Sequence, residues 1–187
     1  MKIYVVDNYD SFVYNIVYLL KELGISDLKI EKNDRVDLDE VAAYDKIVLS
    51  PGPGIPSEAG NMMAVIDRFH RSHALLGICL GHQAIGEYFG WSLQQLTEPL
   101  HGVISSLDIC QRADLFQDVP GDITIGHYHS WVVKPRDPSV LEVLATDPDK
   151  QVMALKHKQY PVFGLQFHPE SVLTAYGKNI LNNWLHI

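Results

Sequence analysis

The chain has 187 residues, a length typical of one domain with its own hydrophobic core, and we expect residues 1–187 to form a single domain. Its formal net charge of −8 disfavours nucleic acids and anionic membranes as partners, because both bind basic surfaces. The sequence holds only two cysteines and shows neither a signal peptide nor an apolar run of membrane-spanning length, so we expect a soluble, cytoplasmic protein.

The first half of the chain alternates short apolar runs with segments of helical periodicity. Apolar residues after Ser11 recur at helical spacing as far as Leu23, which predicts a helix capped by Ser11 and ended by Gly24. Strands and helices that alternate in this way predict an α/β fold in three layers, with a mostly parallel central sheet and helices on both faces. The other expected helices are near 37–42 and 61–69, and the expected strands are 3–6, 28–31, 47–49 and 74–78.

After Gly90 the pattern changes to short strands separated by turn residues. Such strands predict an antiparallel or mixed region added to the parallel sheet, followed by a closing helix at about 176–185. The expected strands of this region are 93–96, 103–109, 123–127, 131–134, 140–146, 152–157 and 162–167.

The segment 77–83 (GICLGHQ) has the form of a nucleophile elbow with cysteine as its central residue. It follows a predicted strand and opens a predicted helix, and Gly77 and Gly81 allow the two elements to approach closely. At a helix N-terminus, free N–H groups and the helix dipole favour the thiolate of Cys79 over the thiol. The alternative is a small buried cysteine. We also expect Cys110 to be buried, because no elbow motif surrounds it.

A cysteine nucleophile needs a base, and the base needs an orienting group. In the segment 166–171 (QFHPES), His168 and Glu170 are two residues apart, so in extended backbone their side chains point to the same side. Glu170 can then bind one imidazole nitrogen while the other faces the thiol, and Pro169 fixes the backbone between them. Alone this segment indicates a surface turn, but with the elbow it predicts a triad of Cys79, His168 and Glu170.

Attack of a thiolate on an amide forms an oxyanion, which needs hydrogen-bond donors already in place. One expected donor is the N–H of Leu80, next to the nucleophile. The second is expected in the loop 50–54 (SPGPG), at Gly54, because this loop follows the third strand and lies at the same sheet edge as Cys79. A phosphate-binding loop is a weaker alternative, since the Gly-Lys-Ser/Thr pattern is missing. A plain turn is the other alternative.

Two histidine pairs have spacings that in principle suit a metal ion: His127 with His129, and His70 with His73. Neither pair has an evident third ligand, and a thiol mechanism needs no metal. We therefore expect no metal and no other cofactor.

Six motifs follow one another along the chain: segments 7–12 (DNYDSF), 50–54, 77–83, 101–102 (HG), 128–130 (YHS) and 166–171. Together they resemble class I glutamine amidotransferases, and within that family the small subunits of anthranilate synthase and of aminodeoxychorismate (para-aminobenzoate) synthase. The resemblance covers nearly the whole chain and implies a flavodoxin-like fold. The chain departs from the family pattern at His127, Trp131 and Val103, outside the predicted triad.

The resemblance implies a role for each motif. Cys79 would form a thioester, His168 would act as base and then as acid, and Glu170 would orient His168. The segment 8–12 would face a chorismate-binding large subunit, the component I of either synthase. The residues implied to bind glutamine are Gly52, Pro53, Gly54, Gln83, Ser130 and Trp131.

The implied reaction is the hydrolysis of L-glutamine to L-glutamate and ammonia, with the ammonia passed to the large subunit to make anthranilate for tryptophan. The same role in 4-amino-4-deoxychorismate synthesis for folate, or a subunit shared by both pathways, is the nearest alternative. A free-standing γ-glutamyl thiol hydrolase and a catalytically idle interaction module are more distant ones. The intact triad argues against the idle module, and the partner-facing motif argues against the free-standing hydrolase.

Overall fold

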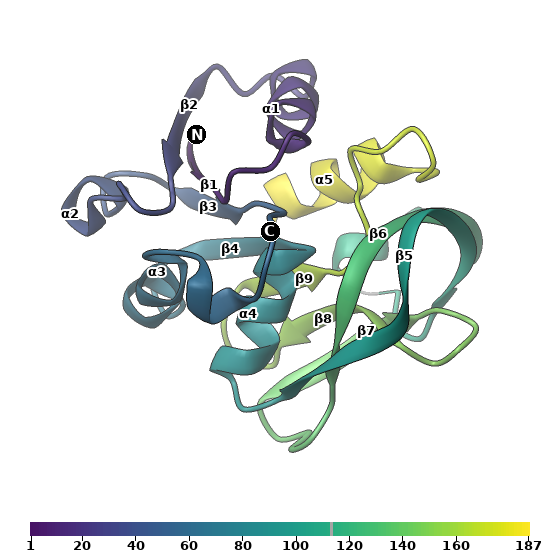
Figure 1. Cartoon of the computed structure of the whole chain (residues 1–187). Coiled ribbons are helices and arrows are strands. Elements are labelled where there is room, and N and C mark those ends of the chain that lie inside the picture. The colour runs from purple at the N-terminus through teal and green to yellow at the C-terminus, as the bar shows by residue number, and fades with distance from the viewer. Residues whose placement is uncertain (113) are drawn as a thin grey trace.

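The computed structural model describes residues 1–112 and 114–187. Their strands form one sheet in the order β2-β1-β3-β4-β9-β8-β7-β5-β6 (Figure 1). The strands are β1 (Lys2–Asp7), β2 (Asp27–Lys32), β3 (Lys46–Leu49), β4 (Ala74–Ile78), β5 (Ser92–Ile109), β6 (Asp122–Lys134), β7 (Leu141–Thr146), β8 (Val152–His157) and β9 (Val162–Leu165). The helices are α1 (Val13–Glu22), α2 (Leu38–Val41), α3 (Met62–Phe69), α4 (Leu80–Tyr88) and α5 (Gly177–Leu185), with short 3₁₀ turns at Pro56–Glu58 and Asp114–Phe116.

The sheet has a parallel half and an antiparallel half. Strands β2, β1, β3, β4 and β9 run parallel, whereas β8, β7, β5 and β6 continue the sheet with antiparallel pairings. The predicted α/β fold with an added antiparallel region is therefore confirmed. Because β9 pairs with β4, the last of the described strands lies in the centre of the sheet.

Helices cover both faces of the parallel half, as the alternation of side chains along a strand requires. Ile3 and Val5 of β1 face a core shared with α1 and α5, while Tyr4 and Val6 face a second core shared with α3 and α4. Figure 1 shows the two helix layers on opposite sides of the strands. No helix within the described residues combines the length and apolar content needed to cross a membrane.

The antiparallel half contains longer strands than predicted. The expected strands 93–96 and 103–109 are parts of β5, and 123–127 and 131–134 are parts of β6, so that the two form one long curved ribbon (Figure 1). The pairing shifts register between Gln95 and Leu100 and between His101 and Val103, and it continues beyond both points. Bulges of this kind bend a strand without ending it. The turn residues therefore led to the wrong prediction that each long strand is two short ones.

The expected start of the first helix was wrong, although its end was right. Helix α1 begins at Val13 without a side-chain cap, because Asp10 Oδ1, and not Ser11, accepts the N–H of Phe12 at 2.7 Å. This turn closed by an Asp side chain satisfies the donor just ahead of the helix. The helix ends at Glu22, and Gly24 follows with a φ of 88°, the left-handed conformation that favours glycine after a helix.

The expected burial of Cys110 was also wrong, since its side chain is exposed. Cys110 directly follows β5, where Leu107 is buried and Asp108 is exposed. Side chains alternate between the two faces of a strand, so Cys110 falls on the outer face with Asp108. The strand pattern therefore overrides the general tendency of free cysteines to be buried.

Candidate active site

Cys79 lies at a sharp turn between β4 and α4, the elbow that the sequence predicts. Its backbone has φ 52° and ψ −100°, a left-handed φ that a non-glycine residue adopts only under constraint. The constraint comes from close packing, because a Cβ on Gly77 would overlap the backbone of Gly81, and a Cβ on Gly81 would overlap the backbone of Leu49. The turn places the side chain of Cys79 at the N-terminus of α4, with Leu80 as the first helical residue.

His168 and Glu170 follow β9, the strand that lies beside β4. Nδ1 of His168 and Oε1 of Glu170 are 2.7 Å apart, and both side chains are buried. The rings of Phe12 and Tyr128 contact the imidazole with centroid separations of 5.4 and 5.0 Å. The structure thus brings together all three residues of the predicted triad, at the ends of two adjacent parallel strands.

The environment of His168 favours its charged form. Burial alone would lower the pKa of this imidazole, but its interactions with the Cys79 thiol and the Glu170 carboxylate outweigh burial and raise the pKa to about 10. Nε2 of His168 is buried and has no hydrogen-bond partner among the described residues. This nitrogen therefore remains available to the thiol and to a substrate.

A cavity of about 210 Å³ opens at Cys79. All of the residues predicted to bind glutamine line it, together with Tyr128 and His129, which were not assigned to the site from the sequence. Both belong to the 128–130 motif, so the motif itself was a signal for them. The lining residues are Gly52, Pro53, Gly54, Cys79, Gln83, Tyr128, His129, Ser130 and Trp131.

The loop 50–54 is fixed at its base by buried amides. The side-chain Nδ2 of Asn8 donates to the carbonyl of Ser50 at 2.8 Å, its backbone N–H donates to Ser50 Oγ at 2.9 Å, and Asn33 donates to Asn8 Oδ1 at 3.0 Å. Gly52 packs so tightly that an added Cβ would lie 2.7 Å from the Asn8 carbonyl oxygen. Gly54 has a φ of 76° and lines the cavity. The loop approaches Cys79 as backbone, the form in which its N–H groups can reach a ligand.

The histidine pairs considered as metal ligands are hydrogen bonded within the protein. His127 Nδ1 and His129 Nε2 are 3.0 Å apart, His70 Nδ1 lies 2.9 Å from the Ile66 carbonyl oxygen, and His73 Nδ1 lies 2.8 Å from Ser72 Oγ. Within residues 1–112 and 114–187, no three side chains of His, Cys, Asp or Glu are grouped as a metal site requires.

A family model described as glutamine amidotransferase class-I matches residues 4–187. The chain belongs to the class I glutamine amidotransferases. Anthranilate synthase component 2 of Mycobacterium tuberculosis is 44% identical over 191 residues, covering 99% of this chain and 82% of that protein. Aminodeoxychorismate/anthranilate synthase component 2 of Bacillus subtilis is 37% identical over 186 residues, covering 98% and 95%.

Among solved structures, a candidate GMP synthase subunit of Thermoplasma acidophilum matches with a TM-score of 0.89 and 32% identity, covering 100% of this chain and 92% of that one. These similarities confirm the predicted family, fold and enzyme class. In this glutamine amidotransferase, four motifs follow the parallel strands β1, β3, β4 and β9, and the 128–130 motif lies in β6 and lines the cavity at Cys79.

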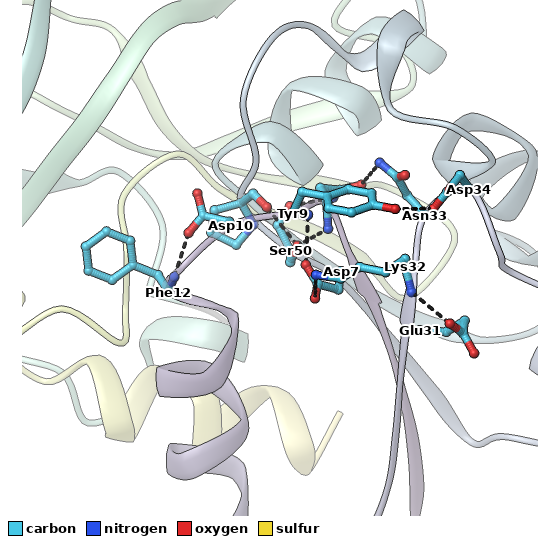
Figure 2. Close-up of polar contacts among 11 residues, drawn as sticks. Asp7, Tyr9, Asp10, Phe12, Glu31, Lys32, Asn33, Asp34 and Ser50 are labelled. Atoms are coloured by element: carbon cyan, nitrogen blue, oxygen red, sulfur yellow. Dashed lines mark hydrogen bonds and ion pairs between the residues drawn. The ribbon is translucent and has the colours of Figure 1, made fainter.

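Of the segment expected to face a partner of this amidotransferase, Tyr9 and Ser11 are exposed, whereas Asn8 is buried beneath them. The Tyr9 hydroxyl donates to Asp34 at 2.7 Å, and Lys32 Nζ lies 4.5 Å from the Tyr9 ring while it pairs with Asp7 at 2.5 Å (Figure 2). Tyr9 is therefore held in place by charged neighbours, and the buried Asn8 contacts the loop 50–54.

The raised pKa of His168 predicts how this amidotransferase responds to pH. A folded-state pKa of about 10, above the ordinary 6.5, means that protonation of His168 stabilises the fold below pH 6.5 and that this stabilisation is lost as the pH rises towards 10. NMR titration should show a protonated His168 ring at neutral pH. In Glu170→Gln the ring should lose its proton at lower pH, because a carboxylate partner is gone. Titration near 6.5 in both proteins would contradict the charged pair.

Proposed function

We propose that this chain is the glutaminase component of an anthranilate synthase and hydrolyses L-glutamine to L-glutamate and ammonia. The observation that carries the proposal is the position of the strained Cys79: it lines a cavity walled by backbone and amide groups, and it interacts with the buried His168–Glu170 pair. The relatives named as anthranilate synthase components, which match almost the entire chain, support the choice of pathway. We place this domain, residues 1–187, in the cytoplasm.

In the first half of the reaction, the thiolate of Cys79 attacks the γ-carboxamide carbon of glutamine, with His168 holding the thiol proton on Nε2. The carbonyl oxygen becomes an oxyanion, which the N–H groups of Leu80 and Gly54 stabilise. His168 then donates its proton to the departing nitrogen. The C–N bond breaks, ammonia leaves, and a γ-glutamyl thioester remains on Cys79.

In the second half, water replaces ammonia. Nε2 of His168 takes a proton from the water as its oxygen attacks the thioester carbon, and the same donors stabilise the second oxyanion. The C–S bond breaks, and glutamate leaves with a regenerated Cys79–His168 pair. Glu170 keeps its hydrogen bond to Nδ1 throughout, which orients the ring and stabilises its positive charge.

Glutamine would be held by the cavity wall formed by Gly52, Pro53, Gly54, Gln83, Ser130 and Trp131. The amide nitrogen of Gln83 donates to the Trp131 carbonyl at 2.9 Å, but among the described residues no donor binds Gln83 Oε1. This oxygen is therefore a suitable acceptor for the α-ammonium group of the substrate. Backbone groups of Ser130 and Trp131 would meet the remaining polar atoms of the amino acid.

Ammonia would pass to a chorismate-binding large subunit that docks beside the cavity. Exposed aromatic side chains support a docking face there, because Tyr9, Tyr14 and Tyr18 are 54%, 64% and 62% exposed. Aromatic residues are enriched in protein interfaces. Asn8 joins this face to the loop 50–54 through its contacts with Ser50 and Gly52, so docking could adjust the Gly54 peptide through the loop.

The isolated chain is expected to be a poor glutaminase that its partner activates by about tenfold or more. Glutamate release is measured with the chain alone and with the large subunit of either anthranilate synthase or aminodeoxychorismate synthase, and a Cys79→Ala chain controls for contaminating activity. The large subunit of anthranilate synthase should activate the chain. Activation only by the large subunit of the other synthase would overturn the proposed pathway, and full activity that neither partner changes would favour a free-standing hydrolase.

A further inference from the structure

A buried carboxamide lies against the nucleophile and has no part in the mechanism above. Gln166 follows β9 and is fully buried, and its Nε2 lies 3.7 Å from Sγ of Cys79, within hydrogen-bonding distance of sulfur. The backbone N–H of Gln166 donates to the Met153 carbonyl at 2.8 Å, so the residue is anchored to the neighbouring strand β8. The side chain therefore has a fixed origin from which it reaches the thiol.

The orientation of the Gln166 amide follows from its neighbours. The Trp131 carbonyl can only accept, so the Gln83 atom 2.9 Å from it must be the amide nitrogen. The second hydrogen of that nitrogen points to Gln166 at 3.3 Å, which requires the Gln166 atom there to be Oε1. The remaining Gln166 group, the NH₂, therefore faces the sulfur of Cys79.

The Trp131 carbonyl that sets this orientation is hydrogen bonded to the buried His129, which is in turn hydrogen bonded to the buried His127. His129 Nδ1 lies 3.1 Å from the carbonyl oxygen, His127 Nδ1 lies 3.0 Å from His129 Nε2, and Ser105 Oγ lies 2.7 Å from His127 Nε2. Burial lowers the pKa of both imidazoles, so each carries one hydrogen. The terminal carbonyl then fixes the direction: Ser105 donates to His127, His127 to His129, and His129 to Trp131.

We propose that Gln166 is a further catalytic residue, whose amide N–H donates to the Cys79 sulfur and stabilises it as thiolate. The proposal rests on the proposed role of Cys79 as nucleophile. A hydrogen bond to a charged acceptor is stronger than one to a neutral acceptor, so the contact favours thiolate over both thiol and thioester. It therefore acts when the thiolate attacks glutamine, and again when sulfur leaves as thiolate during thioester hydrolysis.

The test measures alkylation of Cys79 by iodoacetamide as a function of pH. The background is Cys110→Ser, because Cys110 is exposed and would otherwise react. Gln166→Met removes the donor and keeps a side chain of similar length, while Gln94→Met, at an exposed position, is the matched control. At pH values where the Cys79 thiolate is only partly formed, Gln166→Met should react up to about tenfold more slowly than its parent, and the control should not differ.

The shape of the pH profile separates this role from a structural one. If Gln166→Met has lost a hydrogen-bond donor to the thiolate, its alkylation rate should converge with that of its parent at alkaline pH, where Cys79 is fully ionised in both proteins. Superimposed profiles, or a slowing by the same factor at every pH, would overturn the proposal. If circular dichroism shows that Gln166→Met does not fold, Gln83→Met is measured instead. A smaller shift of its alkylation profile in the same pH direction supports the proposal, and an unchanged profile overturns it.

These measurements do not involve glutamine, so they remain informative whatever the substrate. A different result would refute the proposed function itself: glutamine-dependent activity that persists in Cys79→Ser. If the alkylation profile of Cys79 is the same with and without Gln166 while the chain keeps full partner-dependent glutaminase activity, that result would refute only the role of Gln166.

Discussion

Replacing Cys79 with serine is expected to lower glutamine-dependent synthesis by the complex by about a thousandfold or more. A hydroxyl ionises far less readily than a thiol, and the charged His168–Glu170 pair is suited to a thiolate partner. Synthesis is measured with glutamine and, separately, with added ammonia. The ammonia-dependent rate should be unchanged, because free ammonia bypasses the glutaminase site.

The glutamine analogue 6-diazo-5-oxo-norleucine tests the same assignment without a mutation. It should label Cys79 and abolish glutamine-dependent activity, and mass spectrometry should find Cys110 unmodified. Because Cys110 is exposed, its lack of modification would show that the cavity recognises the analogue and that accessibility alone does not decide which cysteine reacts. The matched variant Cys110→Ser should keep full activity. Normal glutamine-dependent activity in Cys79→Ser would refute the mechanism.

His168→Ala is expected to lose about a thousandfold or more in kcat, and Glu170→Gln clearly less. In the proposed mechanism the imidazole transfers the proton in both half-reactions, whereas Glu170 orients the ring and stabilises its charge. A glutamine at position 170 keeps an oxygen that can accept from Nδ1, so part of the orientation survives. Steady-state glutamate release with the large subunit present gives both values.

Circular dichroism and thermal unfolding are the controls for these variants, since both side chains are buried. Each variant should fold, because the strands on either side of the pair are held by their own pairings. Equal and complete loss of activity accompanied by aggregation would show instead that the His168–Glu170 pair supports the structure, and the catalytic assignment would lose that evidence.

Elements with a local signal could be predicted from the sequence almost to the residue. Strand β4 matches its expected range, and β8 (Val152–His157) does too, because each is a compact apolar run bounded by polar or turn residues. The long β5 was divided wrongly, since Pro99 and Gly102 indicate turns although the pairing with β6 passes them. Whether a turn residue ends a strand or bulges from it depends on the partner strand, which no local pattern contains.

The site divides in the same way. The elbow at Cys79 and the spacing of His168 and Glu170 are local features, and both were predicted. That the pair lies beside the elbow follows from the pairing of β9 with β4, a long-range contact that no local pattern contains. The need of a cysteine nucleophile for a base, together with the family resemblance, was the reason to expect it. Gln166 was not assigned a role, because the direction of its amide depends on Gln83 and the Trp131 carbonyl.

The pairing of β4 with β9 also determines when a newly made chain acquires its chemistry. The ribosome synthesises the Cys79 elbow well before β9, because four strands, β5 to β8, lie between the two in the sequence. Until β9 enters the centre of the sheet, Cys79 has neither the His168–Glu170 pair nor the Gln166 amide beside it, so its thiol lacks a base. A nascent or stalled chain that ends before β9 is therefore expected to consume no glutamine, because the thiol gains its proposed base only when β9 pairs with β4.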